Sequence, residues 1–182
     1  MKNIILLISI FLSFNGFGQL INNLDFKNGI AKFKTGDDIS KYKNYLTPVT
    51  TRFNTSNLQV YKYTKGDVTH IYGVDINQIN LFFCKNKLQM IQLELGLGVE
   101  KSAQFTESEF KLLKNKFINN FGVFQKEQSV NNEEDTGGML LWDASIIRLE
   151  LIWLKNYQDQ FYGGYILLKN KNIEHKCNLS DF

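Results

Sequence analysis

The sequence FTESEFKLLKNKFINNFG, residues Phe105–Gly122, predicts one helix whose start and end are both marked. Thr106 and Glu109 have the spacing of a capping box, in which each side chain bonds the backbone N–H of the other residue. Gly122 is the residue type that most often follows the last turn of a helix. We therefore expect a helix that starts at the Thr106 cap and ends just before Gly122.

The two faces of this predicted helix have different chemistry. Phe105, just before the cap, has the position of a hydrophobic staple partner for Phe110. Apolar residues recur at helical spacing on one face, and they are Phe110, Leu113, Phe117, Ile118 and Phe121. Lysines 111, 114 and 116 fall on the other face. This pattern indicates that the helix packs one side on a core and exposes the other to water.

Segments with the character of β-strands lie on both sides of the helix in the sequence. Those before it are Leu58–Tyr63, His70–Val74, Ile76–Cys84 and Leu88–Leu95, and those after it are Val123–Gln128, Met139–Trp142, Ile146–Leu154 and Tyr162–Lys169. Turn residues and short connections separate them, so neighbouring strands should be antiparallel. Ile147, Leu149, Leu151 and Trp153 alternate with Arg148 and Glu150, and Ile91, Leu93 and Leu95 alternate with Gln92 and Glu94. Such alternation predicts sheets with one buried and one partly exposed face.

A second, weaker helix is expected before the first group of strands. Asp38 can serve as its N-cap, Ile39, Tyr42, Tyr45 and Leu46 supply an apolar stripe, and Pro48 ends it. The order of one helix and then several strands therefore occurs twice. It predicts an α+β fold built as a tandem repeat of one helix plus a three- to four-stranded antiparallel sheet. The repeats would cover about residues 24–98 and 99–172 of a single domain, residues 19–182, which ends in a C-terminal tail.

The segment Lys34–Pro48, KTGDDISKYKNYLTP, resembles the opening of small bacterial envelope proteins. The outer-membrane-assembly lipoprotein family and the tandem β-lactamase inhibitor proteins have such an opening, a short helical element before an antiparallel sheet. The helix that ends in Phe121-Gly122-Val123 is similar to the same opening in a second copy. The resemblance implies tandem helix-plus-sheet repeats. The chain lacks the lipobox of the first family, and no binding residue of the second can be placed by motif.

The first eighteen residues have the pattern of a cleavable secretory signal. Lys2 is followed by a short apolar run, Ile4–Phe14, and by small residues that end at Gly18. The run is shorter than the ~20 apolar residues that a membrane-spanning helix needs. The residue directly after the expected cleavage site is Gln19 and not a cysteine, so we expect an exported protein, periplasmic or extracellular, without a stable membrane anchor. The formal net charge of +3, from lysines scattered along the chain, argues against nucleic acid as a partner.

The two cysteines, Cys84 and Cys177, have two interpretations. An oxidising compartment would permit a disulfide between them. Alternatively, Cys84 lies beside Phe82 and Phe83 and could be a small buried hydrophobic residue. The sequence leaves both alternatives open.

No catalytic, metal-binding or cofactor-binding motif is recognisable. His70 and His175 are the two histidines, and neither lies near a nucleophile motif. The segment Glu174–Cys177 lacks the four convergent ligands of a structural zinc site, and the acidic loop from Glu133 to Gly138 lacks the alternating ligands of a calcium loop. We therefore predict no catalytic residues, no metal and no cofactor.

Aromatic side chains are the remaining candidates for a binding surface. Tyr61 and Tyr63 alternate with Leu58 and Val60, which we assign to the core, and Tyr72 lies in a short strand. We therefore predict that Tyr61, Tyr63 and Tyr72 form part of a partner-binding surface on an exposed sheet face, because tyrosine combines apolar area with a hydrogen-bonding group. The function that we expect is an exported, non-enzymatic protein that binds an unknown protein or envelope component. The alternatives are a small secreted enzyme with a carboxylate site outside known motifs, and a carrier of a small apolar ligand.

Overall fold

A computed structural model of the chain describes residues 21–51, 57–96, 105–131, 136–155, 161–174 and Cys177. The predicted signal peptide lies outside the described residues. In chain order the elements are a helix over residues 21–27, β1 (Gly29–Ile30), β2 (Phe33–Lys34), η1 (Ile39–Lys41), η2 (Lys43–Tyr45), β3 (Leu46–Pro48), β4 (Leu58–Tyr63), β5 (His70–Ile71), β6 (Val74–Asp75), β7 (Gln78–Cys84), β8 (Lys87–Leu95), α2 (Glu107–Phe121), β9 (Lys126–Asn131), β10 (Thr136–Asp143), β11 (Ile147–Lys155), β12 (Phe161–Asn170) and α3 (Lys171–Glu174).

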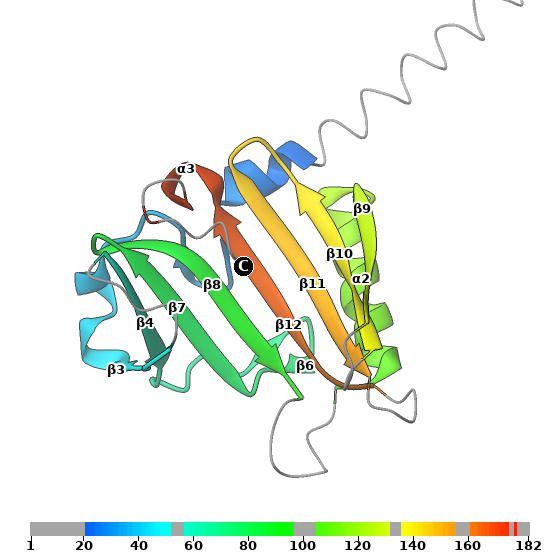
Figure 1. The fold of residues 1–182 in the computed structure, drawn as a ribbon, viewed down its shortest axis with the longest axis horizontal. Coiled ribbons are helices and arrows are strands. Elements are labelled where there is room, and N and C mark those ends of the chain that lie inside the picture. Colours follow the sequence, from blue (N-terminus) through cyan, green and yellow to red (C-terminus); the bar gives the residue numbers. More distant parts are fainter. Residues whose placement is uncertain are drawn as a thin grey trace, which may run out of the picture.

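Eight of the described strands form one antiparallel sheet in the order β3-β4-β7-β8-β12-β11-β10-β9. Strands β3, β4, β7 and β8 of the N-terminal half form one lateral half of the sheet, and β9 to β12 of the C-terminal half form the other. The two halves meet where β8 pairs with β12, for example at Leu93 and Ile166. Figure 1 shows the result, a broad twisted sheet with α2 behind the β9–β10 side.

One face of this sheet carries the main core. Leu113, Phe117 and Phe121 of α2 are buried against it, together with Trp142 of β10 and Leu149 of β11. The helix over residues 21–27 and the hairpins β1–β2 and β5–β6 add Leu24, Phe33 and Ile71 to the same core. We call this side the covered face.

Two contacts fix α2 on the covered face. At its C-terminus, the indole Nε1 of Trp142 donates to the carbonyl of Gly122 at 2.7 Å. Near its N-terminus, Phe110 packs on Trp153 with ring centroids 4.6 Å apart. Gly138 lies opposite Trp153 in the sheet, and a Cβ there would lie 2.1 Å from an indole carbon. Because Gly138 has no side chain, the Trp153 ring fits beside it and can pack against Phe110 of α2.

The structure confirms the predicted helix in detail. Thr106 is the N-cap, and its capping box with Glu109 is complete. Gly122 ends the helix with φ +82°, a conformation that glycine adopts without strain. The predicted strands are also present, with ends shifted by at most three residues, except for the segment His70–Val74. That segment is a tight hairpin, because Tyr72 and Gly73 both have positive φ and reverse the chain between β5 and β6.

The predicted first helix is wrong. Asp38 does act as an N-cap, since its side chain accepts from the backbone N–H of Ser40, but the segment forms only the two 3₁₀ turns η1 and η2. A short helix is costly to nucleate, and the residue before a proline favours extended backbone. Here the residues up to Pro48 become strand β3, which pairs with β4 at the edge of the sheet.

The mixed α and β composition and the antiparallel sheet are therefore confirmed at the level of fold class. A tandem repeat of helix plus sheet is not shown. The strands of both halves belong to one continuous sheet, and no helix like α2 forms at Ile39–Tyr45, where the first repeat would require it.

Cys84 and Cys177 lie at disulfide distance, with their Cα atoms 6.0 Å apart. The structure thus favours the bridge over a free buried thiol. Cys84 alternates with Phe83 along β7, so it points away from the covered face. The bridge therefore places Cys177 on the opposite side of the sheet from α2.

Candidate functional site

The sheet face opposite α2 is the candidate site, and we call it the open face. Figure 1 looks onto this face, and no helix in the described part of the chain lies over its centre. Its side chains follow from the strand register, because residues paired across neighbouring strands point to the same side. Met139, Ile152, Tyr165, Glu94 and Gln78 form one such row across β10, β11, β12, β8 and β7.

Apolar side chains gather on the three strands of the C-terminal half. They are Met139 and Leu141 of β10, Ile152 and Leu154 of β11, and Tyr165 and Leu167 of β12. We call these six residues the apolar strip. All except Leu167 are only half-buried, so the strip presents apolar atoms to solvent on the C-terminal half of the open face.

Amide and carboxylate groups adjoin the strip on β7 and β8. Asn80 donates to Glu94 at 2.7 Å and to Gln92 at 3.0 Å, and Gln78 donates to Asn80 at 2.9 Å. We call these four residues the amide cluster. Burial raises the pKa of Glu94, while the hydrogen bond from Asn80 and the charge of Lys62 act in the opposite direction. The cluster thus holds a half-buried carboxyl that neighbouring amides orient.

Burial and the nearby charge of Glu94 also raise the pKa of the Tyr165 hydroxyl. Tyr165 therefore stays protonated at neutral pH and can donate a hydrogen bond. Because Tyr165 is the register partner of both Ile152 and Glu94, it joins the apolar strip to the amide cluster.

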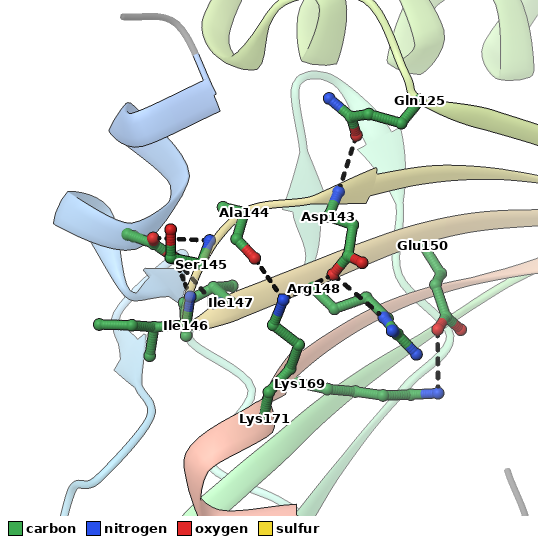
Figure 2. A network of polar contacts seen from close by, with 11 residues as sticks. Gln125, Asp143, Ala144, Ser145, Ile146, Ile147, Arg148, Glu150, Lys169 and Lys171 are labelled. Carbon is green, nitrogen blue, oxygen red and sulfur yellow. Dashed lines mark hydrogen bonds and ion pairs between the residues drawn. The ribbon is translucent and has the colours of Figure 1, made fainter. Parts of the chain in front are cut away.

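Charged residues occupy the end of the open face that is nearest to the β10–β11 turn, as Figure 2 shows. Lys169 donates to Glu150 at 3.0 Å. Asp143 accepts from Lys171 at 2.9 Å and from Arg148 at 3.4 Å. These two cations hold the pKa of Asp143 below its usual value, although burial acts against them. The charges at this end of the face are therefore paired.

The β10–β11 turn beside this network is held from the covered side of the molecule. The carboxylate of Asp25, on the helix over residues 21–27, accepts from the backbone N–H groups of Ser145, Ile146 and Ile147 at 2.7–2.9 Å. Gln125 accepts from the backbone N–H of Asp143 at 2.8 Å. These bonds hold the backbone of the β10–β11 turn in place beside the charged end of the open face.

The predicted exposure of Tyr61 and Tyr63 is wrong. Tyr63 is buried on the covered face, where its ring meets Phe33 edge-on with centroids 5.0 Å apart and its hydroxyl contacts Lys32 and Asp67. Tyr61 is half-buried on the same face and packs on Phe83.

Strand β4 has apolar residues in both phases, and this explains the error. Leu58 and Val60, which the alternation places in the main core, lie instead on the open face and form a smaller cluster with Phe82 and Met90. In such a strand, alternation cannot show which phase meets the larger core. The aromatic phase faces the main core here.

Tyr72 is exposed, as predicted, but it does not lie on the open face. It occupies the β5–β6 turn on the covered side, with its ring edge-on to Phe117 at a centroid distance of 5.9 Å. Asn120 of α2 donates to its hydroxyl at 3.3 Å. The structure therefore does not bring the three predicted tyrosines together on one surface.

The histidines and the acidic loop, which were considered for catalysis or metal binding, lie away from the open face or outside the described residues. The Nε2 of His70 lies 2.6 Å from Asp75 across the β5–β6 hairpin, at the surface. His175 and the loop residues 133–135 lie outside the described residues. Within the described ranges, no three His, Cys, Asp or Glu side chains are grouped so that they could hold a metal ion. No helix in these ranges is long and apolar enough to cross a bilayer.

Sequence reasoning missed most of the open face, although part of the signal was present. Glu150, Gln92 and Glu94 occupy the polar phase of their strands, so their side of the sheet was predictable. The pairing of Glu150 with Lys169 depends on the order of β11 and β12 in the sheet. Comparison with protein-family models, curated proteins and solved structures gives no match for this chain. The geometry of the chain itself is therefore the basis for proposing a function.

Proposed function

We propose that this protein is an exported, non-enzymatic binding protein that recognises a protein or an envelope component through the open face of its sheet. The observation that carries this proposal is the apolar strip, which is half-buried and has no described helix packed over it. Contiguous apolar surface on a folded domain commonly marks an interaction site. The strip spans β10, β11 and β12, so a partner would rest on rigid sheet.

The surroundings of the strip support a protein partner. Interfaces between proteins have an apolar centre and a polar rim, and tyrosine is enriched among the residues that dominate binding. Within the strip, Tyr165 borders the amide cluster through its register partner Glu94, and it can offer both apolar area and a hydrogen bond. The cluster and the paired charges around Asp143 would form the polar rim.

Export is the second part of the proposal. The signal-like segment that ends at Gly18 supports it, and so does the disulfide-distance pair of Cys84 and Cys177. Disulfides persist in periplasmic and extracellular proteins and are rare in reducing compartments. A periplasmic or extracellular location is thus consistent with both features.

We also propose that the two halves of the sheet are copies of one ancestral unit, as the resemblance to tandem envelope proteins implies. The strand order supports this idea: β3-β4-β7-β8 and β9-β10-β11-β12 are each added in chain order, and the last strands of both sets pair at the centre. In this interpretation, the turns η1 and η2 correspond to α2. The β5–β6 hairpin would then be an insertion in the first copy.

A comparison of surface variants in capture experiments tests the proposed interface. We would immobilise the wild type, the open-face variant Ile152→Ser/Tyr165→Ser and the control variant Leu112→Ser/Lys116→Ser, which changes exposed residues of α2, and expose each to envelope extract. We expect the open-face variant to lose the captured partner, because aromatic anchors can contribute about 2 kcal/mol or more each. Retention by the open-face variant, or equal loss by the control, would contradict the proposal.

A further inference from the structure

The covered side of the molecule holds a cavity of about 780 Å³ that no part of the open face shares. Pockets for drug-sized ligands commonly have volumes of about 300–1,000 Å³. The helix over residues 21–27, the β1–β2 and β5–β6 hairpins and α2 all contribute residues to its lining. Leu149 and Leu168 of the central strands form the floor.

The interior of this cavity is apolar. Phe33, Ile71, Phe117 and Phe121 line its walls, and these residues belong to the main core. These four side chains are at most 7% exposed, so the apolar lining that meets water belongs mainly to Phe26, Ile30 and Tyr72. A molecule that enters would replace water on these less buried side chains. Apolar ligands of moderate size suit such a lining because their transfer from water is favourable.

The charged residues that line the cavity are all bases. Lys27 and Lys34 contribute to the lining together with His70, and no aspartate or glutamate does so. Lys27 donates to Asn120 at 3.1 Å and lies over the ring of Phe121. In the described residues, neither lysine forms a salt bridge with a carboxylate. Both lysines thus line the cavity without a carboxylate partner.

Two lining residues have backbone conformations that their side chains disfavour. Ala31 has φ +53° in the β1–β2 turn, and Tyr72 has φ +52° in the β5–β6 turn. Asn-Gly is the favoured sequence for such a two-residue turn, yet Tyr72 precedes Gly73 here. Residues held in the left-handed region often cluster at ligand-binding sites. The unfavourable turn keeps a tyrosine ring at the cavity.

We propose that this cavity binds a free amphipathic carboxylate of the fatty-acid class. The apolar chain would lie against Phe26, Ile30 and Tyr72, and the carboxylate would meet Lys27 and Lys34. Tyr72 would cover part of the chain. This site is separate from the open face, and the proposal does not rest on the function assigned to that face.

Isothermal titration calorimetry of the purified protein with dodecanoate, below its micelle concentration, tests the proposal. We expect one bound molecule per chain and tighter binding of dodecanoate than of the uncharged dodecanol. Lys27→Gln/Lys34→Gln should weaken dodecanoate binding by about tenfold or more, since it removes charge-assisted contacts, and should leave dodecanol binding unchanged. The matched control Lys43→Gln/Lys85→Gln removes two exposed lysines that do not line the cavity and should bind dodecanoate as the wild type does.

A second variant tests the position of the ligand's chain. Tyr72→Asn is compatible with the turn, so it should fold, and it should weaken both dodecanoate and dodecanol. The open-face variant Ile152→Ser/Tyr165→Ser should bind dodecanoate normally. The proposal is overturned if the wild type binds no dodecanoate, if both lysine double variants lose affinity equally, or if the protein binds phosphatidylglycerol vesicles but not the monomeric acid.

Discussion

Lys169 donates to Glu150 at 3.0 Å on the open face of the sheet, and both side chains are at most 8% exposed. The two residues are on adjacent strands, β12 and β11, and the apolar strip adjoins them. A buried ion pair of this kind contributes little net stability when intact. Removing one partner, however, leaves the other as an uncompensated buried charge. The pair therefore fixes the local structure of the face that we propose as the interface.

Replacing one member of this pair should be more harmful than replacing both. We expect Lys169→Met to destabilise the protein by about 3–5 kcal/mol, because Glu150 would remain as a buried, unpaired charge. The double variant Lys169→Met/Glu150→Met should recover most of this loss. Urea unfolding of the wild type and the two variants measures the difference. A double variant no more stable than Lys169→Met would show that an unpaired Glu150 charge does not cause the loss.

The helix face is tested by a core substitution and a surface substitution in adjacent positions. Phe117→Ala should cost about 3–5 kcal/mol, because it leaves a cavity beside Trp142 and Tyr72. Lys116→Ala, on the exposed side of α2, should change the free energy of unfolding by less than about 0.5 kcal/mol. Similar losses for the two variants would mean that α2 does not pack as described.

Glu94 should make stability depend on pH. Burial raises the pKa of this carboxyl in the folded state, so the folded protein holds its proton at pH values where the unfolded chain has released it. Stability from this group is then greatest in acid and falls as the pH rises through the raised pKa. Glu94→Gln should therefore be more stable than the wild type at pH 7 and equal to it below about pH 4.

Thermal unfolding at several pH values checks this prediction. Lys62→Gln, which removes the cation whose charge lowers the pKa of Glu94, should increase the dependence on pH. If Glu94→Gln destabilises the protein at pH 7, the carboxylate is a favourable partner of the amide cluster and the assigned direction is incorrect.

The pair Cys84–Cys177 closes a loop between residues 93 positions apart. In the chain-entropy model a bridge over such a loop stabilises the folded state by about 4–5 kcal/mol. We expect exported protein to contain no titratable thiol and to melt at a lower temperature after reduction. The variant Cys84→Ala/Cys177→Ala should melt like the reduced wild type and should not respond to reductant. Two free thiols in exported protein would rule out the bridge.

Local signals explain why α2 was predictable from the sequence. Its cap, its staple and its C-terminal glycine all lie within the segment Phe105–Gly122, so no distant contact is needed to recognise them. The segment Ile39–Leu46 has a similar apolar spacing but becomes 3₁₀ turns and an edge strand. Pairing with β4 decides its conformation, and such pairing is not visible locally.

The candidate sites were less predictable, because they depend on which strands are neighbours. The alternation of Tyr61 and Tyr63 with Leu58 and Val60 was recognised correctly, but the identity of the covered phase was not. The apolar strip requires the order β10-β11-β12 in the sheet. The cavity collects residues from seven elements, and no spacing in the sequence indicates that they meet.

Site-specific photocrosslinking in the producing cells tests the central claim, that the open face is the recognition surface. A benzophenone amino acid would replace Ile152, in the apolar strip, or Leu112, which is 38% exposed on α2. The account predicts that irradiation links a discrete partner to the protein through position 152 and not through position 112. Crosslinks only from position 112, or none from position 152 in folded, exported protein, would contradict it.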